Sequence, residues 1–218
     1  MINNFNFPEG VEWSFNYVSG PDFFSDDFKF STAEKLLYYY SGYVVKYLDI
    51  SNATSARNMF YNCINLISLP QLDTSNVTDM YNMFYGCRNL LSIPQLDTSK
   101  VTDMSYMFYN CTKLTTIPQL DTSNVTTMSN LFNGCNYLTT IPQLDISKVT
   151  SMYNIFYNCV HLVEVRFKGK PISTLNVNNM FSGIKTNGTL YYDSRYDYSK
   201  IINVLPSTWT AVPYDVLN

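Results

Sequence analysis

The sequence is poor in charge and has almost no histidine. Its 218 residues include 1 His, 14 Lys and Arg and 17 Asp and Glu, so 14% of residues are charged and the formal net charge is −3. Ordinary soluble domains carry about 25% charged residues. Because no run of Lys and Arg provides the basic surface that phosphate backbones require, a nucleic-acid partner is not expected.

Long apolar segments are missing as well. The longest apolar runs, at 35–40 and 43–47, are far shorter than the roughly 20 residues that a membrane-spanning helix needs. We therefore expect no membrane insertion. The first eight residues contain neither a basic region nor an apolar stretch, so no secretory signal is read in this sequence.

What the sequence has instead is an internal repeat rich in aromatic residues, with 19 Tyr and 14 Phe in all. The segment from Leu72 to Gln95 returns at Leu96, Leu120 and Leu144, and more loosely at Leu48, which makes five units with a period of 24. A sixth, degenerate unit carries Met180 and Phe181. Units of this length are stable only when stacked, so the repeat predicts a solenoid.

Comparison of the units predicts which side chains point inward. These are the positions that stay apolar from unit to unit: Leu72, Val77, Met80, Met83, Phe84, Cys87, Leu90 and Ile93. The steps of three and four residues after Val77 are typical of a helix. Ser75 is placed as the N-cap of this helical turn, with Asp79 in its first turn, where the helix dipole favours a carboxylate.

Equivalent positions of successive units, which we call columns, also predict backbone conformation. The residue before each cysteine alternates between Asn and Gly, as in Asn62 and Gly86, and both residue types tolerate a positive φ, so this column is predicted to close the helical turn. The leg from Leu90 to Leu96 is expected to be extended and to pair in parallel with its copies. Its strands should be short, because prolines such as Pro94 lack an amide donor.

The predicted fold class is therefore α/β: a solenoid of about 24-residue units with short parallel strands and short helical turns, capped at both ends. Residues 48–167 form the five repeats. Residues 1–47 do not fit the period and are interpreted as an N-terminal cap or attachment segment, with a short helix over 32–40. Residues 168–218 hold the degenerate repeat and a C-terminal cap, with a strand at 188–193, a short helix at 199–205 and an edge strand at 209–212.

The motifs Cys-x-x-Leu-x-x-Ile-Pro and Val-Thr-x-Met-x-x-Met-Phe-x-Gly/Asn-Cys give the chain a family resemblance. It resembles the bacterial surface leucine-rich repeats of the BspA type, and most of all the variant first catalogued as a mycoplasma lipoprotein repeat of unknown function. The resemblance covers about residues 48–167. It implies a right-handed, curved leucine-rich-repeat solenoid on a cell envelope, used in adhesion or host contact, and it names no catalytic residue.

Proteins with this repeat that lack a secretion signal also look like components of phage particles. The implied location is therefore extracellular or on a cell surface if a signal was removed, and otherwise a virion. The function expected first is non-enzymatic recognition or adhesion through an exposed solenoid face, with a host-surface protein or glycan as partner. The alternative is a structural component of a phage virion (tail, fibre or capsid decoration) that is anchored by its N-terminal segment to other virion proteins.

Two columns resemble metal-binding sites but have simpler structural interpretations. The five cysteines, 24 residues apart at Cys63, Cys87, Cys111, Cys135 and Cys159, lack the clustered pairs of zinc sites, so we interpret them as buried reduced thiols. The acidic column from Asp49 to Asp145 has a serine two residues after each Asp, which indicates Asx turns. Bound calcium is the alternative there, although the glycine-rich turns of calcium solenoids are missing.

Tyrosines form the column set that we expect to bind a partner. Rigid amphipathic rings are typical of protein contact patches and sugar-stacking platforms, and these rings follow inward residues, so they should be partly exposed. Packing over neighbouring coils is the competing interpretation. The candidate ligand-binding residues are Tyr61, Tyr81, Tyr85, Tyr106, Tyr109, Tyr153 and Tyr157.

Catalysis finds little support in the sequence. A pair of Cys159 with the sole histidine, His161, is conceivable, but the same cysteine column recurs in four other units without a histidine. No nucleophile elbow, phosphate loop or metal-ligand motif occurs. No catalytic residue, cofactor-binding residue, metal site or cofactor is therefore predicted, and the protein is not expected to be an enzyme.

Overall fold

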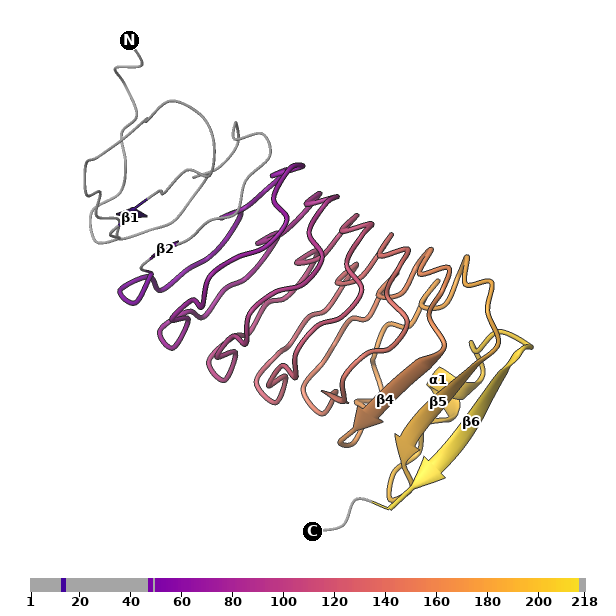
Figure 1. Ribbon diagram of the computed structural model, residues 1–218. Helices are drawn as coiled ribbons and strands as arrows, with labels where there is room; N and C mark the ends of the chain where they lie inside the picture. The colour runs from indigo at the N-terminus through magenta and orange to yellow at the C-terminus, as the bar shows by residue number, and fades with distance from the viewer. Residues whose placement is uncertain (1–12, 15–46, 49, 216–218) are drawn as a thin grey trace.

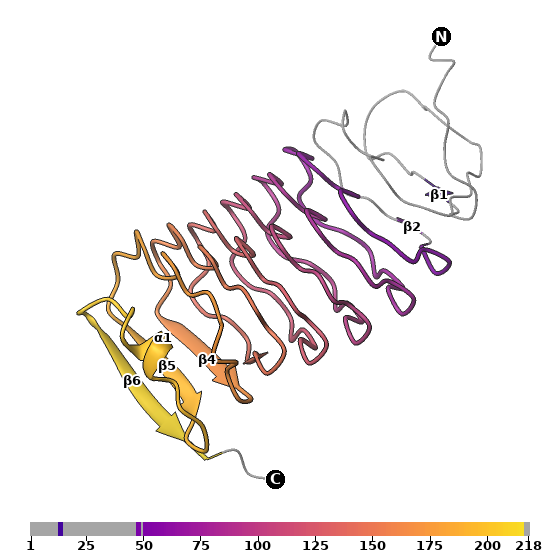
Figure 2. The ribbon, with the colours of Figure 1, turned by 180° about the vertical axis from the view of Figure 1, so that it is seen from behind.

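The computed structural model describes residues 13–14, 47–48 and 50–215. Over the repeats the chain is a parallel β-solenoid whose coils stack in one row, as two opposite views show (Figures 1 and 2). One ladder of parallel bridges links equivalent residues of successive coils, in the order Ser55, Asp79, Asp103, Thr127, Ser151 and Asn176. The predicted solenoid and its spacing of about 24 residues are therefore confirmed.

Regular elements gather at the two ends of the described chain. Strands β1 (Trp13–Ser14) and β2 (Tyr47–Leu48) pair antiparallel. Strands β3 (Leu144–Asp145), β4 (Glu164–Lys168), β5 (Gly188–Asp193) and β6 (Trp209–Tyr214) form one parallel sheet in that order. The short helix α1 (Ser199–Ile202) lies between β5 and β6 in the sequence.

The C-terminal strands were predicted closely. The strand predicted at 188–193 is β5, and the edge strand predicted at 209–212 is β6, which continues to Tyr214. The predicted helix is α1, which ends at Ile202 and not at Leu205. The prediction of a helix over 32–40 and the role of residues 1–47 as a cap fall almost wholly outside the described residues.

The core is a stack of identical side chains, as the columns predicted. All eight inward positions of the repeat beginning at Leu72 are buried. Five phenylalanine rings stack along the solenoid axis with centroids 5.3–5.9 Å apart and interplanar angles of 3–11°: Phe60, Phe84, Phe108, Phe132 and Phe156. Each coil therefore completes its apolar core only through its neighbours.

The predicted helical turns are wrong. In the leg that follows Val77 the chain makes consecutive turns in which Met83 donates to Met80, Tyr85 to Asn82 and Cys87 to Phe84. The amides in between donate to the next coil, Phe84 to Met107 and Gly86 to Tyr109. An α-helix would use all of these amides within itself. Here every second backbone amide donates within its own coil and the others donate to the neighbouring coil. These hydrogen bonds between coils hold the solenoid together.

The residues placed at a helix start have other roles. Ser75 caps no helix, and its amide donates to Asp73 Oδ1 at 3.0 Å. Asp79 belongs to the bridge ladder, and its Oδ1 accepts the amide of Tyr81 at 2.8 Å. The short steps of three and four residues thus arise from turns that bury the same columns as a helix would.

The positive φ predicted before each cysteine is confirmed. Asn62, Asn110 and Asn158 have φ of 56–57°, and the intervening Gly86 and Gly134 have φ of 72° and 77°. Such a residue is the third of a type II turn. A second positive-φ column, which the sequence analysis missed, lies four residues earlier and consists of Asn58, Asn82, Tyr106, Asn130, Asn154 and Asn179.

The extended leg at 90–96 pairs in parallel less than predicted. Leu91 donates to Ile67 and Thr115 to Leu91, but the continuous bridge ladder runs through Asp79 and its equivalents instead. Apart from β2, which pairs antiparallel with β1, strands form on this leg only from β3 onward, and the longer strands β4 to β6 lie beyond the last prolines of the repeat. A missing amide in each earlier coil explains why the strands there stay unformed.

Candidate functional site

Five of the seven candidate tyrosines form one continuous cluster on the surface of the first three coils. Tyr61, Tyr85 and Tyr109 stack face to face, with neighbouring centroids 4.7 Å apart and interplanar angles of 13° and 8°. Tyr106 connects this stack to Tyr81. The ring centre of Tyr106 lies 5.7 Å from that of Tyr109 and 5.7 Å from that of Tyr81. All five rings are half-buried. We call these residues the tyrosine cluster.

An arginine closes one side of the tyrosine cluster. The guanidinium of Arg57 lies 3.9 Å from the ring centre of Tyr81, and its Nη1 is 3.4 Å from Asp79 Oδ2. A cation over a tyrosine face is attracted by the ring quadrupole. Partial burial, and to a smaller degree the neighbouring phenols, raise the pKa of Tyr85 and of Tyr106 above the ordinary value. The hydroxyl groups therefore stay protonated and can donate hydrogen bonds at neutral pH.

Tyr106 occupies a backbone position that suits asparagine. Its φ is 59°, and every other described residue at that column is Asn. In the column, Asn82 donates to Asn58 Oδ1 at 3.0 Å and Asn154 donates to Asn130 Oδ1 at 3.1 Å. Residue 106 offers no side-chain amide to Asn82 Oδ1, which is buried without a hydrogen-bond partner, and Asn154 Oδ1 is also unpartnered although the next coil carries an asparagine in this column. The tyrosine therefore strains the backbone and breaks a ladder of side-chain amides.

The other two candidates, Tyr153 and Tyr157, lie apart from the tyrosine cluster. Tyr153 is 38% exposed, and Tyr157 is half-buried. Within the described part of the chain, neither ring has an aromatic contact, although Tyr153 is close enough to contribute to the raised pKa of Tyr106, after burial, Tyr81 and Tyr109. Asn133 separates Tyr157 from the stack, since it takes the ring's place in the intervening coil.

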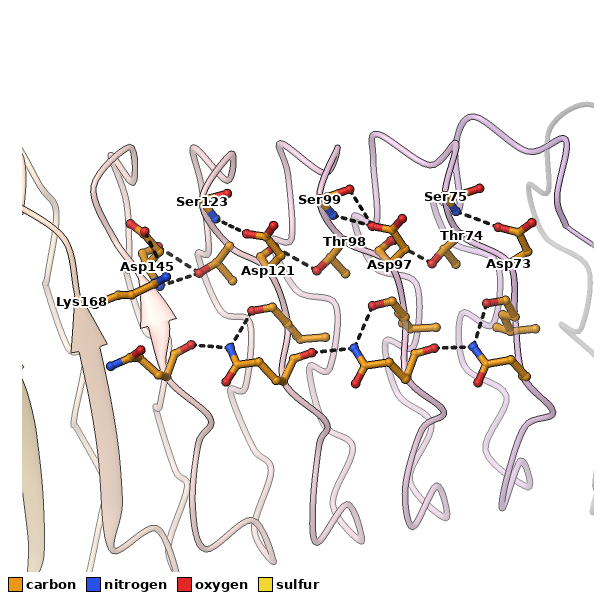
Figure 3. Close-up of a pocket in the computed structure, with 18 residues that line it drawn as sticks. Asp73, Thr74, Ser75, Asp97, Thr98, Ser99, Asp121, Ser123, Asp145 and Lys168 are labelled. Atoms are coloured by element: carbon orange, nitrogen blue, oxygen red, sulfur yellow. Dashed lines mark hydrogen bonds and ion pairs between the residues drawn. The ribbon is translucent and has the colours of Figure 1, made fainter. Parts of the chain in front are cut away.

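A polar groove runs across four coils on another part of the surface (Figure 3). It has a volume of about 1140 Å³. Its walls include the acidic column Asp73, Asp97, Asp121 and Asp145 and a column of glutamines. Each glutamine amide reaches the next coil, with Gln71 donating to Gln95 O at 2.6 Å and Gln95 to Gln119 O at 2.8 Å. The sequence analysis missed this glutamine column, although the recurrence of Gln every 24 residues is visible in the sequence.

From Asp73 onward the acidic column forms the Asx turns that we predicted, whereas Asp49 lies outside the described residues. The amides of Ser75, Ser99, Ser123 and Ser147 each donate to Oδ1 of the Asp two residues earlier, at 3.0 Å. Hydrogen bonds from the serine hydroxyls and then from these amides lower the pKa of Asp73, Asp97 and Asp121. Lys168 Nζ lies 3.7 Å from Asp145 Oδ2 and ends the row of carboxylates. The carboxylates thus have a structural partner without a metal ion.

The cysteines are buried thiols that form no disulfide, as predicted. The Sγ of Cys87 donates to Phe60 O at 3.0 Å, and the three later cysteines repeat this contact one coil on. Desolvation raises the pKa of the thiols of Cys87, Cys111, Cys135 and Cys159. His161 is exposed and stacks on Tyr137, with ring centres 5.7 Å apart, whereas Cys159 is fully buried. A buried, protonated thiol is a poor nucleophile.

The described residues contain neither a metal-binding cluster nor a membrane-spanning helix. They hold no group of three or more His, Cys, Asp or Glu side chains that is arranged to bind a metal ion. Among the same residues no helix has the length and apolar character required to cross a bilayer.

Comparison with known sequences places the chain in a family. It matches the family described as "Mycoplasma protein of unknown function, DUF285" over residues 30–116 and 88–191. These two overlapping matches cover more than half of the chain, which therefore belongs to this family of repeat proteins. No curated protein and no solved structure matches the chain.

Proposed function

We propose that this solenoid is a non-enzymatic recognition module, displayed on an exterior surface, that binds a host protein or glycan through the tyrosine cluster. The observation that carries the proposal is Tyr106. Its positive φ and the orphaned Asn82 Oδ1 both lower stability, yet its ring links the two parts of the cluster. Backbone strain retained beside a group of half-buried surface aromatic rings is typical of binding sites.

The surface itself supports the same proposal. Tyrosine combines a large apolar ring with a hydroxyl and has few rotatable bonds, so it forms contacts at a low entropic cost. In the tyrosine cluster mutual stacking and Arg57 hold several rings in place before a partner arrives. Pre-ordered side chains strengthen binding because less freedom is lost on association.

We also propose that the coil is a variant of the right-handed BspA-type leucine-rich repeat in which turns replace the helical segment. The repeated Cys-x-x-Leu-x-x-Ile-Pro motif supports this assignment. Use of such repeats in adhesion agrees with an exterior location for the protein.

A binding screen against glycans, host-surface proteins and phage particle proteins tests the proposed function. The full chain is compared with Tyr85→Ser and Tyr109→Ser, and with Tyr137→Ser as the matched control, because Tyr137 is 58% exposed and lies outside the tyrosine cluster. We expect each cluster variant to lose binding that the control retains. Unchanged binding in both cluster variants contradicts the proposal, and binding to phage particle proteins alone favours the virion alternative.

A further inference from the structure

The chain contains two Asn-Gly pairs, Asn133–Gly134 and Asn187–Gly188. Asparagine is a thermolabile residue, and a glycine that follows it has no side chain to keep its backbone nitrogen away from the asparagine side chain. Whether such a pair reacts depends on how firmly the fold holds that nitrogen and that side chain. The two pairs differ in both respects, so each serves as a reference for the other.

The first pair is held on both sides. Asn133 is only 8% exposed, and its Nδ2 donates to Asn130 Oδ1 at 2.9 Å. The amide of Gly134 donates to Tyr157 O in the next coil at 2.8 Å. Because the side chain and the backbone nitrogen are both fixed by hydrogen bonds, this pair can react only after local unfolding.

The second pair has a free side chain. Asn187 is exposed and precedes β5, which begins at Gly188. Within the part of the chain that the structure describes, the side chain of Asn187 makes no hydrogen bond. Its neighbours are anchored, since the hydroxyl of Thr186 donates to Leu162 O and the amide of Thr189 donates to Val163 O at 2.9 Å. The Asn187 side chain can therefore turn toward the nitrogen of Gly188 without breaking a contact of its own.

We propose that Asn187 is a site of spontaneous deamidation. The backbone nitrogen of Gly188 attacks Cγ of Asn187 and gives up its proton, while the bond from Cγ to Nδ2 breaks and Nδ2 leaves with that proton as ammonia. Water then adds to one of the two carbonyl carbons of the resulting succinimide and breaks its bond to nitrogen. The product is aspartate or isoaspartate, and the reaction requires no oxidant, reductant or enzyme.

The place of this residue gives the modification a consequence for the C-terminal end of the core. Trp209 Nε1 donates to Thr186 O at 3.0 Å, and the indole lies so close to Gly188 that a Cβ there would be 2.4 Å from Cε2 of Trp209. The same ring covers Phe181, with centroids 5.4 Å apart. Isoaspartate lengthens the main chain by one carbon between Thr186 and Gly188, so Trp209 cannot keep both contacts in this closely packed place.

The test is incubation of the full chain in warm, mildly alkaline buffer, followed by peptide mass spectrometry and enzymatic methylation of isoaspartate. In the folded protein Asn187 should convert at least about tenfold faster than Asn133, which reacts only through unfolding. In guanidinium chloride the protection of Asn133 is removed, so the two rates should become similar. Asn187→Ser should form no isoaspartate at this position.

Equal rates at Asn187 and Asn133 in the folded protein overturn the assignment, and so does an Asn187 that reacts only in guanidinium chloride. The effect on the core is measured by urea unfolding of the separated isoaspartate form. Asn187→Asp is its matched control, because it carries the same charge without the longer main chain. The isoaspartate form should unfold at a lower urea concentration than Asn187→Asp, and equal midpoints refute the loss of the Trp209 contacts.

Discussion

At the scale of single residues, the alternation of Asn and Gly before the cysteines has a steric cause. A Cβ built on Gly86 would lie 2.1 Å from Asn62 Oδ1, and one on Gly134 would lie 2.3 Å from Asn110 Oδ1. The side chain of each Asn therefore occupies the space where the next coil would place a Cβ. Positive φ explains why the column contains only Asn and Gly, and this overlap explains why they take turns.

Gly86→Ala should destabilise the protein by about 2 kcal/mol or more, through left-handed strain of about 1 kcal/mol and the overlap with Asn62. In an Asn62→Gly background the overlap is gone, so only the strain should remain. Urea unfolding of the four proteins in this double-mutant cycle measures the coupling. Equal costs of Gly86→Ala in both backgrounds would refute the steric explanation.

Tyr106→Asn should raise stability by a net amount of about 1 kcal/mol. It relieves backbone strain and restores a donor for Asn82 Oδ1, and these gains exceed the loss of two ring contacts of about 0.5–1 kcal/mol each. Thermal and urea unfolding measure the change. Tyr106→Phe, which keeps the ring and the strain, should leave stability unaltered, and a less stable Tyr106→Asn would contradict the argument.

At the scale of elements, the leg after Val77 shows what sequence can and cannot predict. Its buried columns and its positive-φ Asn62 column were readable, because burial and steric tolerance act on individual residue types. The turn structure was not, because spacing of three and four residues buries the same face in a helix and in successive turns. The choice depends on whether the amides of residues such as Phe84 donate within the coil or to the next one, and that is a property of stacking.

The candidate site was predictable to a similar extent. Column identity located the tyrosines and their partial exposure, and five of them do meet in the tyrosine cluster. The role of Tyr106 was missed because it depends on the backbone conformation of the column of asparagines that it interrupts, such as Asn58 and Asn82, and not on the tyrosine itself. The polar groove depends on neighbouring coils aligning Gln71 and Gln95, so only the stacked structure reveals it.

The cysteine column makes stability sensitive to alkali. Burial raises the pKa of Cys87, Cys111, Cys135 and Cys159, so the folded protein keeps these protons while an unfolded chain releases them above its ordinary pKa of about 8.5. Stability is therefore full below about pH 8.5 and falls as the pH rises above it, by up to about 1.4 kcal/mol per pH unit for each thiol.

Urea unfolding between pH 7 and about pH 10 tests this dependence, and Cys111→Ala should reduce the slope by the share of one thiol. A thiol reagent should react with the folded protein only at the rate of unfolding. Rapid labelling of the native protein, or a slope that is the same in Cys111→Ala, would show that the thiols do not titrate as their burial requires.

At the scale of the whole molecule, contacts between nearest neighbours set the response to removal of a coil. Deletion of residues 97–120 leaves Gly86 beside Gly134, whereas deletion of 73–96 brings Asn62 beside Asn110 and recreates the clash. The two deletions create junctions that have the same local sequence. The variant that lacks 73–96 retains the strained Tyr106, so it also carries Tyr106→Asn. The variant that lacks 97–120 should still be more stable, by about 1–2 kcal/mol. Urea unfolding with equal stability in the two would contradict this expectation.

The alternating Asn and Gly also bear on how such a chain can evolve. Recombination between tandem copies inserts or removes whole repeats, and a single inserted 24-residue repeat breaks the alternation at one junction. A duplication of two repeats preserves it at both junctions. The heritable building block of this array is then a pair of coils, one with Asn and one with Gly, and relatives that differ in length should differ by such pairs.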